Sequence, residues 1–150
     1  MNNYRSPKEW YFLKMAFLVS ERGTCARRKV GCVLVNSKNH VLATGYNGVP
    51  SMITHCSVRG CIRAENNVPS GTRHELCWGL HGEQNVITQC ALHGISTKSS
   101  VLYTTTFPCS ICAKLIISAK IDCIIYLEDY NDDMSKMLLK EATVDVIKYE

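Results

Sequence analysis

The sequence contains no long apolar run, few aromatic residues and no dense stripe of basic residues. It has no stretch of about 18 apolar residues, so we expect no membrane-spanning helix. The N-terminal residues also lack the apolar segment of a secretory signal, which favours a cytoplasmic protein with no membrane partner. With three Phe and two Trp residues, the chain offers little of the basic, aromatic surface that binds single-stranded nucleic acids.

Charge and length indicate a small anionic ligand and one domain. The formal net charge is +4, with basic residues gathered within 22–29 and acidic residues within 128–133. This mild excess suits a phosphorylated small molecule better than a nucleic acid. A chain of 150 residues can bury a core of its own, so we expect residues 1–150 to form a single domain.

The nine cysteines fall into two groups by their sequence surroundings. Their odd number disfavours a closed set of disulfides. Cys32, Cys90 and Cys123 lie in apolar segments, where a thiol commonly packs as a small apolar side chain. The others lie near Gly, Pro, His or charged residues, which favours metal binding.

Hydrophobic periodicity and turn residues predict alternating helices and strands. Ser6 and Pro7 are typical of a helix start, and Trp10 and Phe17 follow at the spacing of a core-facing helix side. We then expect a strand hairpin over 30–35 and 41–46, a long irregular segment over 47–73, a helix from near 81, a strand over 100–105, a helix opened by Pro108, a strand over 123–127, a helix over 132–141 and a strand over 144–148. This order predicts an α/β layered domain with a mixed sheet of about five strands.

Two short motifs carry the strongest chemical signal. His81-Gly82-Glu83 comes first, and Pro108-Cys109-Ser110-Ile111-Cys112 follows after one intervening segment. His81, Cys109 and Cys112 supply three donors that suit a catalytic zinc, which keeps its fourth position open for water. Helix starts near these residues would favour the thiolate form of the cysteines. The H-x-E…P-C-x-x-C pattern is typical of zinc-dependent nucleobase deaminases.

Glu83 follows His81 by two residues, so its carboxylate can face a metal-activated water without binding the metal. There it would take a proton from the water and deliver protons to a ring nitrogen and to the leaving amine. Two other interpretations stay open. A Cys-x-x-Cys pair alone is common in structural zinc and redox sites, and a zinc-binding module without enzymatic activity fits the same ligands.

The chain resembles the deoxycytidylate (dCMP) deaminase family, within the cytidine deaminase superfamily, over most of its length. The resemblance rests on the segments Cys25–Gly31, Thr44–Pro50, His55-Cys56, Gly60-Cys61, Pro69–Gly71, His74–Cys77, His81–Asn85 and Phe107–Lys114. It implies a three-layer α/β/α fold and zinc-dependent hydrolysis of dCMP to dUMP and ammonia, which feeds thymidylate synthesis. It also implies a homo-oligomer, a hexamer, activated by dCTP and inhibited by dTTP, with Mg²⁺ accompanying the triphosphate.

Following this resemblance, we assign four further residues to the substrate. Asn47 matches a sugar contact, although Asn-Gly is also a common turn. Arg27 would bind the 5′-phosphate through its guanidinium group, or lie on the surface in solvent. Tyr130 would close the pocket or be an ordinary loop residue. The backbone N–H of Gly82, where many relatives have Ala, would hold the base carbonyl.

A second, structural zinc is predicted at Cys25, Cys56, His74 and Cys77, where members of the resembled family also carry one. His74 and Cys77 have the short spacing of a ligand pair. A zinc ion would also anchor the long irregular segment 47–73, which has few apolar residues. Cys61 competes for the fourth position. Buried thiols with a helix-capping His74 are the alternative without a metal.

Two alternative substrates stay open. A polynucleotide deaminase acting on tRNA or single-stranded DNA would use the same zinc motifs on a flipped base. A deaminase that accepts dCTP would also share them, because the number of phosphates is read by loop geometry that the sequence does not reveal.

Overall fold

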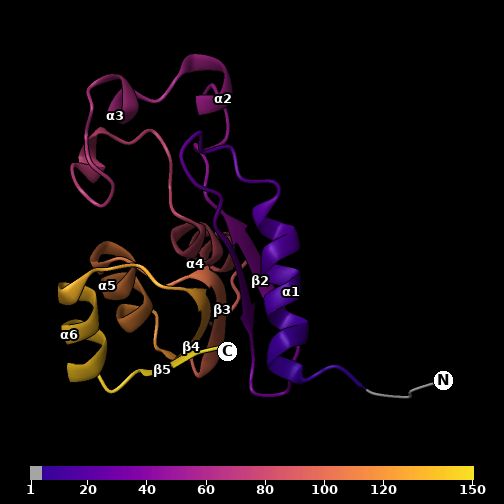
Figure 1. The fold of residues 1–150 in the computed structure, drawn as a ribbon. Coiled ribbons are helices and arrows are strands. Elements are labelled where there is room, and N and C mark those ends of the chain that lie inside the picture. The colour runs from indigo at the N-terminus through magenta and orange to yellow at the C-terminus, as the bar shows by residue number, and fades with distance from the viewer. Residues whose placement is uncertain (1–4) are drawn as a thin grey trace.

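The computed structural model describes residues 5–150, and a five-stranded sheet forms its centre (Figure 1). Its strands are β1 (Gly31–Val35), β2 (Val41–Tyr46), β3 (Ser100–Thr106), β4 (Ile121–Glu128) and β5 (Asp145–Lys148). They lie in the order β2-β1-β3-β4-β5, with β1 antiparallel to both neighbours and with β3, β4 and β5 parallel. The predicted α/β class and mixed sheet are confirmed, and no strand end differs from its prediction by more than two residues.

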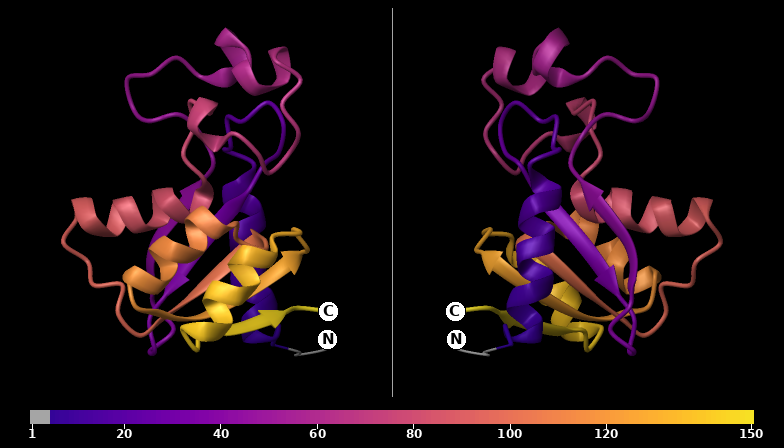
Figure 2. Two further views of the ribbon diagram at one scale, coloured as in Figure 1. Left: turned by 90° about the vertical axis from the view of Figure 1, so that its left-hand side faces the viewer. Right: turned by 90° about the vertical axis from the view of Figure 1, so that its right-hand side faces the viewer.

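Helices cover both faces of this sheet (Figure 2). One face carries α1 (Lys8–Ser20), and the other carries α4 (Gly82–Leu92), α5 (Ser110–Ser118) and α6 (Asp133–Glu141). Each face buries its own apolar cluster, and both clusters take residues from the central strands. The three-layer α/β/α arrangement is therefore confirmed.

Strand β1 joins the two clusters because it lies inside the sheet and all five of its residues are buried. Side chains alternate between the faces of a strand. Cys32 and Leu34 accordingly pack in the cluster of α4 and α5, whereas Val33 and Val35 pack beneath α1. Cys90 joins the first cluster and Cys123 packs against the second, as their apolar sequence surroundings predict.

The N-terminal helix corrects two predictions. It begins at Lys8 after Pro7, and no side chain caps it, so Ser6 is not the cap. Trp10 and Phe17 are 39% and 60% exposed and do not belong to the core. Leu13, which shares the predicted spacing, is buried as expected, and it contacts the sheet together with Phe12 and Ala16. Apolar residues surround this helix on nearly every side, so their spacing alone could not identify the buried face.

Residues 47–81 form a mostly irregular segment beyond one end of the sheet (Figure 1). It contains two single-turn helices, α2 (Cys56–Arg59) and α3 (Ile62–Glu65), and the 3₁₀ helix η1 (His74–Leu76). The prediction of a long irregular segment is thus right in outline, although it missed these short turns. Within the described residues, no helix is both long and apolar enough to span a membrane.

Candidate active site

The starts of α4 and α5 bring the predicted catalytic residues together. His81 precedes α4 as its N-cap residue, and Cys109 precedes α5 in the same way, so α5 begins two residues after Pro108 rather than at it. The backbone N–H of His81 donates to Oε1 of Gln84 at 2.7 Å, which fixes the first turn of α4. Both helix starts place partial positive charge near the site, and this charge favours thiolates and a nearby anion.

His81, Cys109 and Cys112 form one compact group of potential metal donors. Their ligand atoms lie within 4.8 Å of one another, and Nδ1 of His81 lies 3.4 Å from Sγ of Cys109 and 3.3 Å from Sγ of Cys112. Both cysteines are buried. One imidazole and two thiolates suit zinc, and three protein ligands leave one position for water, as in catalytic sites. The residues present therefore fit a catalytic zinc ion.

The pKa values of the Cys109 and Cys112 thiols shift in opposite directions, and this difference suits metal binding. Hydrogen bonding to Cys112, followed by the contact with His81, lowers the pKa of Cys109 to about 4. The same hydrogen bond, together with burial, raises the pKa of Cys112 well above its usual value. The donor group therefore favours a thiolate at Cys109, and a metal that binds here must displace the proton of Cys112 and any proton on His81, whose pKa is raised by the contact with Cys109.

Glu83 lies beside this group. It is 4% exposed, and its Oε2 atom lies 3.5 Å from Sγ of Cys112. Burial raises the pKa of Glu83, although the nearby His81 opposes the rise. A buried carboxyl with a raised pKa can accept and return a proton, which is what a general acid and base requires.

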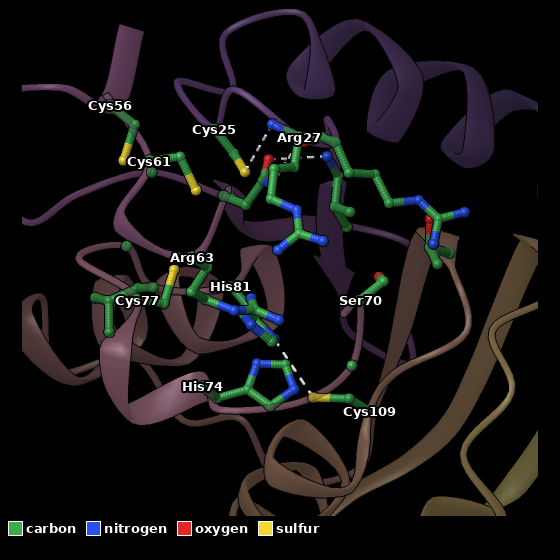
Figure 3. A pocket seen from close by; sticks show the side chains of 18 of the residues that line it. Cys25, Arg27, Cys56, Cys61, Arg63, Ser70, His74, Cys77, His81 and Cys109 are labelled. Atoms are coloured by element: carbon green, nitrogen blue, oxygen red, sulfur yellow. Dashed lines mark hydrogen bonds between the residues drawn. The ribbon is translucent and has the colours of Figure 1, made fainter. Parts of the chain in front are cut away.

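A cavity opens over these residues at the carboxyl ends of β3 and β4 (Figure 3), and parallel strands commonly bind ligands at this end. Its walls include the predicted substrate residues Arg27, Asn47 and Tyr130. Three buried polar atoms of lining residues have no hydrogen-bond partner: Nε of Arg63, Nδ1 of His74 and Oγ1 of Thr106. Buried polar groups are normally satisfied, so these atoms indicate a space built for a polar ligand or ion.

Asn47 and Gly82, two of the predicted substrate residues, also have contacts within the fold. The Asn47 side chain accepts a hydrogen bond from the N–H of Val30 at 2.9 Å and donates to the carbonyl of Arg28 at 2.6 Å. Gly82 is buried against Cys32 at the first turn of α4. Asn47 lines the cavity, whereas Gly82 does not appear on its wall, and the roles of both toward substrate stay predictions.

Arg27 and Tyr130 line the cavity from two different loops. Nη1 of Arg27 donates to the carbonyl of Val68 at 3.0 Å, although its side chain is largely exposed. Tyr130 is partly buried, and the guanidinium of Arg28 lies over its ring at 6.0 Å from the centroid. Neither position excludes the predicted contacts.

Sequence reasoning missed Arg63, a buried residue of α3 that lines the cavity. Its sequence position gave one usable signal, because it lies between Cys61 and Pro69 in a segment already suspected of a function. Nothing in that irregular segment predicted which of its side chains turn inward.

The predicted ligands of a structural zinc are only partly gathered. Cys25, Cys61 and Cys77 lie close enough to Cys56 to add to the rise of its pKa, which is caused first by burial. His74 does not join them, because its ring packs edge-on against His81 with centroids 5.1 Å apart (Figure 3). Among residues 5–150, only His81, Cys109 and Cys112 come within 4.8 Å of one another as a set of three or more donors.

A His/Cys/Cys donor group at two helix starts, with a buried glutamate beside it, is the arrangement typical of zinc-dependent nucleobase deaminases. Residues 6–128 match the family model described as the cytidine and deoxycytidylate deaminase zinc-binding region. The chain belongs to this family.

Several known proteins are similar to this chain. It is 36% identical to the deoxycytidylate deaminase of Schizosaccharomyces pombe over 99% of its own length, and 36% identical to that of Saccharomyces cerevisiae over 93%. It spans less than half of either yeast protein, 46% and 44% respectively. The crystal structure of dCMP deaminase from the cyanophage S-TIM5 with dCMP and dUMP has a TM-score of 0.81 and 28% identity, covering 98% of this chain and 100% of that one.

Proposed function

We propose that this chain catalyses the zinc-dependent hydrolysis of dCMP to dUMP and ammonia and thereby supplies a precursor of thymidylate. The observation that carries the proposal is the gathering of Glu83 with His81, Cys109 and Cys112 in one arginine-lined cavity. The yeast relatives are named deoxycytidylate deaminases, and the cyanophage enzyme was crystallised with dCMP and dUMP.

The chemistry divides between the metal and the chain's own residues. His81, Cys109 and Cys112 would hold a zinc ion, which would supply an activated water whose pKa can fall to about 7 in such sites. Glu83 accepts one proton of the attacking water and delivers it to the ring nitrogen, and then accepts the second proton, from the hydroxyl group added to the ring carbon, and delivers it to the amine, which leaves as ammonia. The backbone N–H of Gly82 holds the base carbonyl, Asn47 contacts the sugar and Tyr130 closes the cavity.

A substrate panel tests this proposal directly. Zinc-loaded protein is assayed with cytidine, deoxycytidine, CMP, dCMP and dCTP, and ammonia and uracil products are measured. We expect dCMP to have the highest kcat/KM. Preferred turnover of dCTP would assign the chain to the triphosphate-accepting alternative, and turnover of tRNA or an oligonucleotide without turnover of dCMP would refute the proposal.

We also propose a second, structural zinc. Support comes from the proximity of Cys25, Cys56, Cys61 and Cys77, which leaves His74 and Cys61 as competitors for the fourth position. Elemental analysis of chelator-free protein should find two zinc ions per chain, and one would reject the site. Loss of one zinc in Cys61→Ser but not in His74→Ala would assign the fourth ligand to Cys61, and the reverse would assign it to His74.

Regulation and assembly complete the proposal, and both follow from the family. We propose a homo-hexamer activated by dCTP and inhibited by dTTP, with Mg²⁺ bound to the triphosphate. Sedimentation analysis and dCMP saturation curves with each triphosphate test these points, and a hyperbolic curve unchanged by either effector would reject the regulation. That residues 1–150 form one domain and work in the cytoplasm also stay predictions.

A further inference from the structure

We propose that Arg63 binds the phosphate group of the nucleotide and sets the preference of this site for a nucleotide over a nucleoside. The inference rests on the proposed deamination of a nucleotide, and it assigns the anion-binding role chiefly to Arg63 rather than to Arg27. It arises from one unusual feature, a buried guanidinium without an anionic partner.

Arg63 is 7% exposed and lies in α3 at the wall of the cavity. Its one side-chain hydrogen bond runs from Nη2 to the carbonyl of Pro69 at 3.3 Å, and its Nε atom is buried without a partner. Across residues 5–150, no carboxylate forms an ion pair with it, although other arginines of the chain have such partners.

Burying the unpaired guanidinium of Arg63 costs free energy unless an anion binds beside it. A guanidinium stays charged at any physiological pH and carries five N–H donors. Burying an ion is unfavourable unless it is paired and hydrogen-bonded, and a single long bond to a carbonyl leaves most of the donors of Arg63 unused. A phosphate supplies both the missing charge and acceptor oxygens that match the fork of the guanidinium.

The surroundings of Arg63 favour an anion as well. The cavity is lined by Arg27, Arg28 and Arg63, and the one carboxylate among its described lining residues is Glu83. Arg28 is already paired with Glu128 at 3.0 Å. In Figure 3 the guanidinium groups of Arg27 and Arg63 both extend into the cavity, on whose wall the hydroxyl of Ser70 also lies.

Arg63 is also better placed than Arg27 to bind the phosphate. The Arg27 side chain is largely exposed, so solvent already compensates its charge, and its contact with the carbonyl of Val68 occupies Nη1. A charge–phosphate contact shielded from water is stronger than one at the surface. We therefore expect Arg27 to assist and Arg63 to dominate.

The competing explanation is structural, since Arg63 anchors the segment through Pro69. The two roles differ in what they do to substrates with and without phosphate. Loss of an anchor would impair dCMP and deoxycytidine by the same factor, because both need the same cavity. Loss of a phosphate contact would impair dCMP alone.

The test compares kcat/KM for dCMP and deoxycytidine in zinc-loaded wild type, Arg63→Gln and Arg63→Lys. We expect Arg63→Gln to lower kcat/KM for dCMP by about 100-fold, chiefly through KM, and to leave that for deoxycytidine within about threefold. Arg63→Lys should lose about tenfold for dCMP, because a lysine keeps the charge without the fork. Arg59→Gln is the matched control, because Arg59 lies in the neighbouring α2, stacks on Trp78 at 3.9 Å and does not line the cavity.

An unchanged ratio between the two substrates in both Arg63 variants would overturn the inference. If Arg63→Gln fails to fold, Arg63→Lys decides alone by the same ratio. A wild type that does not turn over dCMP would instead refute the proposed function. In that case the rise in melting temperature caused by dUMP decides the role of Arg63. If this rise is lost in the Arg63 variants but not in Arg59→Gln, the phosphate contact is supported. If the Arg63 variants keep the rise, the phosphate contact is rejected.

Discussion

Gly82 lies directly against Cys32, and this contact allows α4 to begin close to the sheet. A Cβ atom placed on Gly82 would lie 3.1 Å from Sγ of Cys32 and 3.3 Å from the carbonyl oxygen of Val30. Both separations are shorter than an ordinary van der Waals contact. Gly82 stands between His81 and Glu83, so any displacement at this point would move the proposed metal ligand and the proposed proton-transferring carboxylate together.

We expect Gly82→Ala to lower the free energy of unfolding by about 1 kcal/mol, because the added methyl group crowds a packed interior. The Cys32→Ala variant removes the sulfur, and in that background the same change should cost less or stabilise, since alanine also favours a helix. Urea unfolding of zinc-loaded wild type, both single variants and the double variant measures the coupling. Strictly additive effects would show that the two residues do not compete for space.

The sequence allowed the His/Cys/Cys donor group to be predicted because the signals of its members are local. His81, Cys109 and Cys112 stand at two helix starts, and a helix start depends on a few neighbouring residues. The position of Glu83 beside His81 follows from their separation of two residues in the sequence. The succession of helices and strands and the mixed character of the sheet also followed, because short turns and alternating elements restrict the topology.

Other features depend on contacts that the sequence pattern does not express. Arg63 turns inward because its segment folds back on itself, with its carbonyl accepting from the N–H of Val68 at 2.8 Å and its side chain reaching Pro69. His74 has ligand spacing with Cys77, yet η1 directs its ring toward His81. Similarly, only the packing against the sheet selects which apolar side of α1 is buried.

Glu83→Gln should abolish most activity and leave the metal in place. The amide has nearly the same size, so the buried position stays filled, but it cannot take up a proton. We expect kcat to fall by about 10³-fold, within the usual range for loss of a general acid or base. Zinc content and circular dichroism should equal those of the wild type. Glu141→Gln is the control, because Glu141 is an exposed residue at the end of α6 and does not line the cavity.

Activity of Glu83→Gln within tenfold of the wild type would show that another group transfers the proton. Loss of zinc from this variant would instead show that the carboxylate supports the metal site. The two outcomes separate a proton-transfer role from a structural one.

Asp132 couples α6 to the start of α5. One carboxylate oxygen accepts from the N–H of Ser110 at 2.8 Å, and the other accepts from the N–H of Ser135 at 2.9 Å. Burial acts to raise the pKa of Asp132, but these hydrogen bonds outweigh it and leave the pKa below its usual value of 3.8. The ionised form is therefore favoured by folding.

A lowered pKa in the folded protein gives stability that is present above the unfolded pKa and is lost as the pH falls through the folded one. Asp132→Ala should lower the free energy of unfolding at pH 7 by about 1–2 kcal/mol, the range for losing a helix cap. The difference from wild type should shrink below about pH 4, where the wild-type carboxylate becomes protonated. Thermal unfolding over this pH range measures it.

Asp133→Ala is the matched control for this prediction. Asp133 is the next residue and is exposed, and its recorded side-chain partner is Lys136 at 3.2 Å. We expect a change below about 0.5 kcal/mol, as for an exposed ion pair on a helix. Equal losses in the two variants would show that the double cap of Asp132 contributes little.

Cys109→Ser should remove the catalytic zinc and leave the proposed structural zinc. Cys109 is buried and holds the thiolate of the donor group, and a hydroxyl group ionises far less readily at neutral pH than a thiol. We expect one zinc per chain by elemental analysis, deamination reduced by more than about 10³-fold, and a folded protein by circular dichroism. Cys56→Ser is the reciprocal variant, because it should lose the other zinc and retain measurable turnover. A Cys109→Ser protein that keeps full activity would remove the cysteine from the metal site.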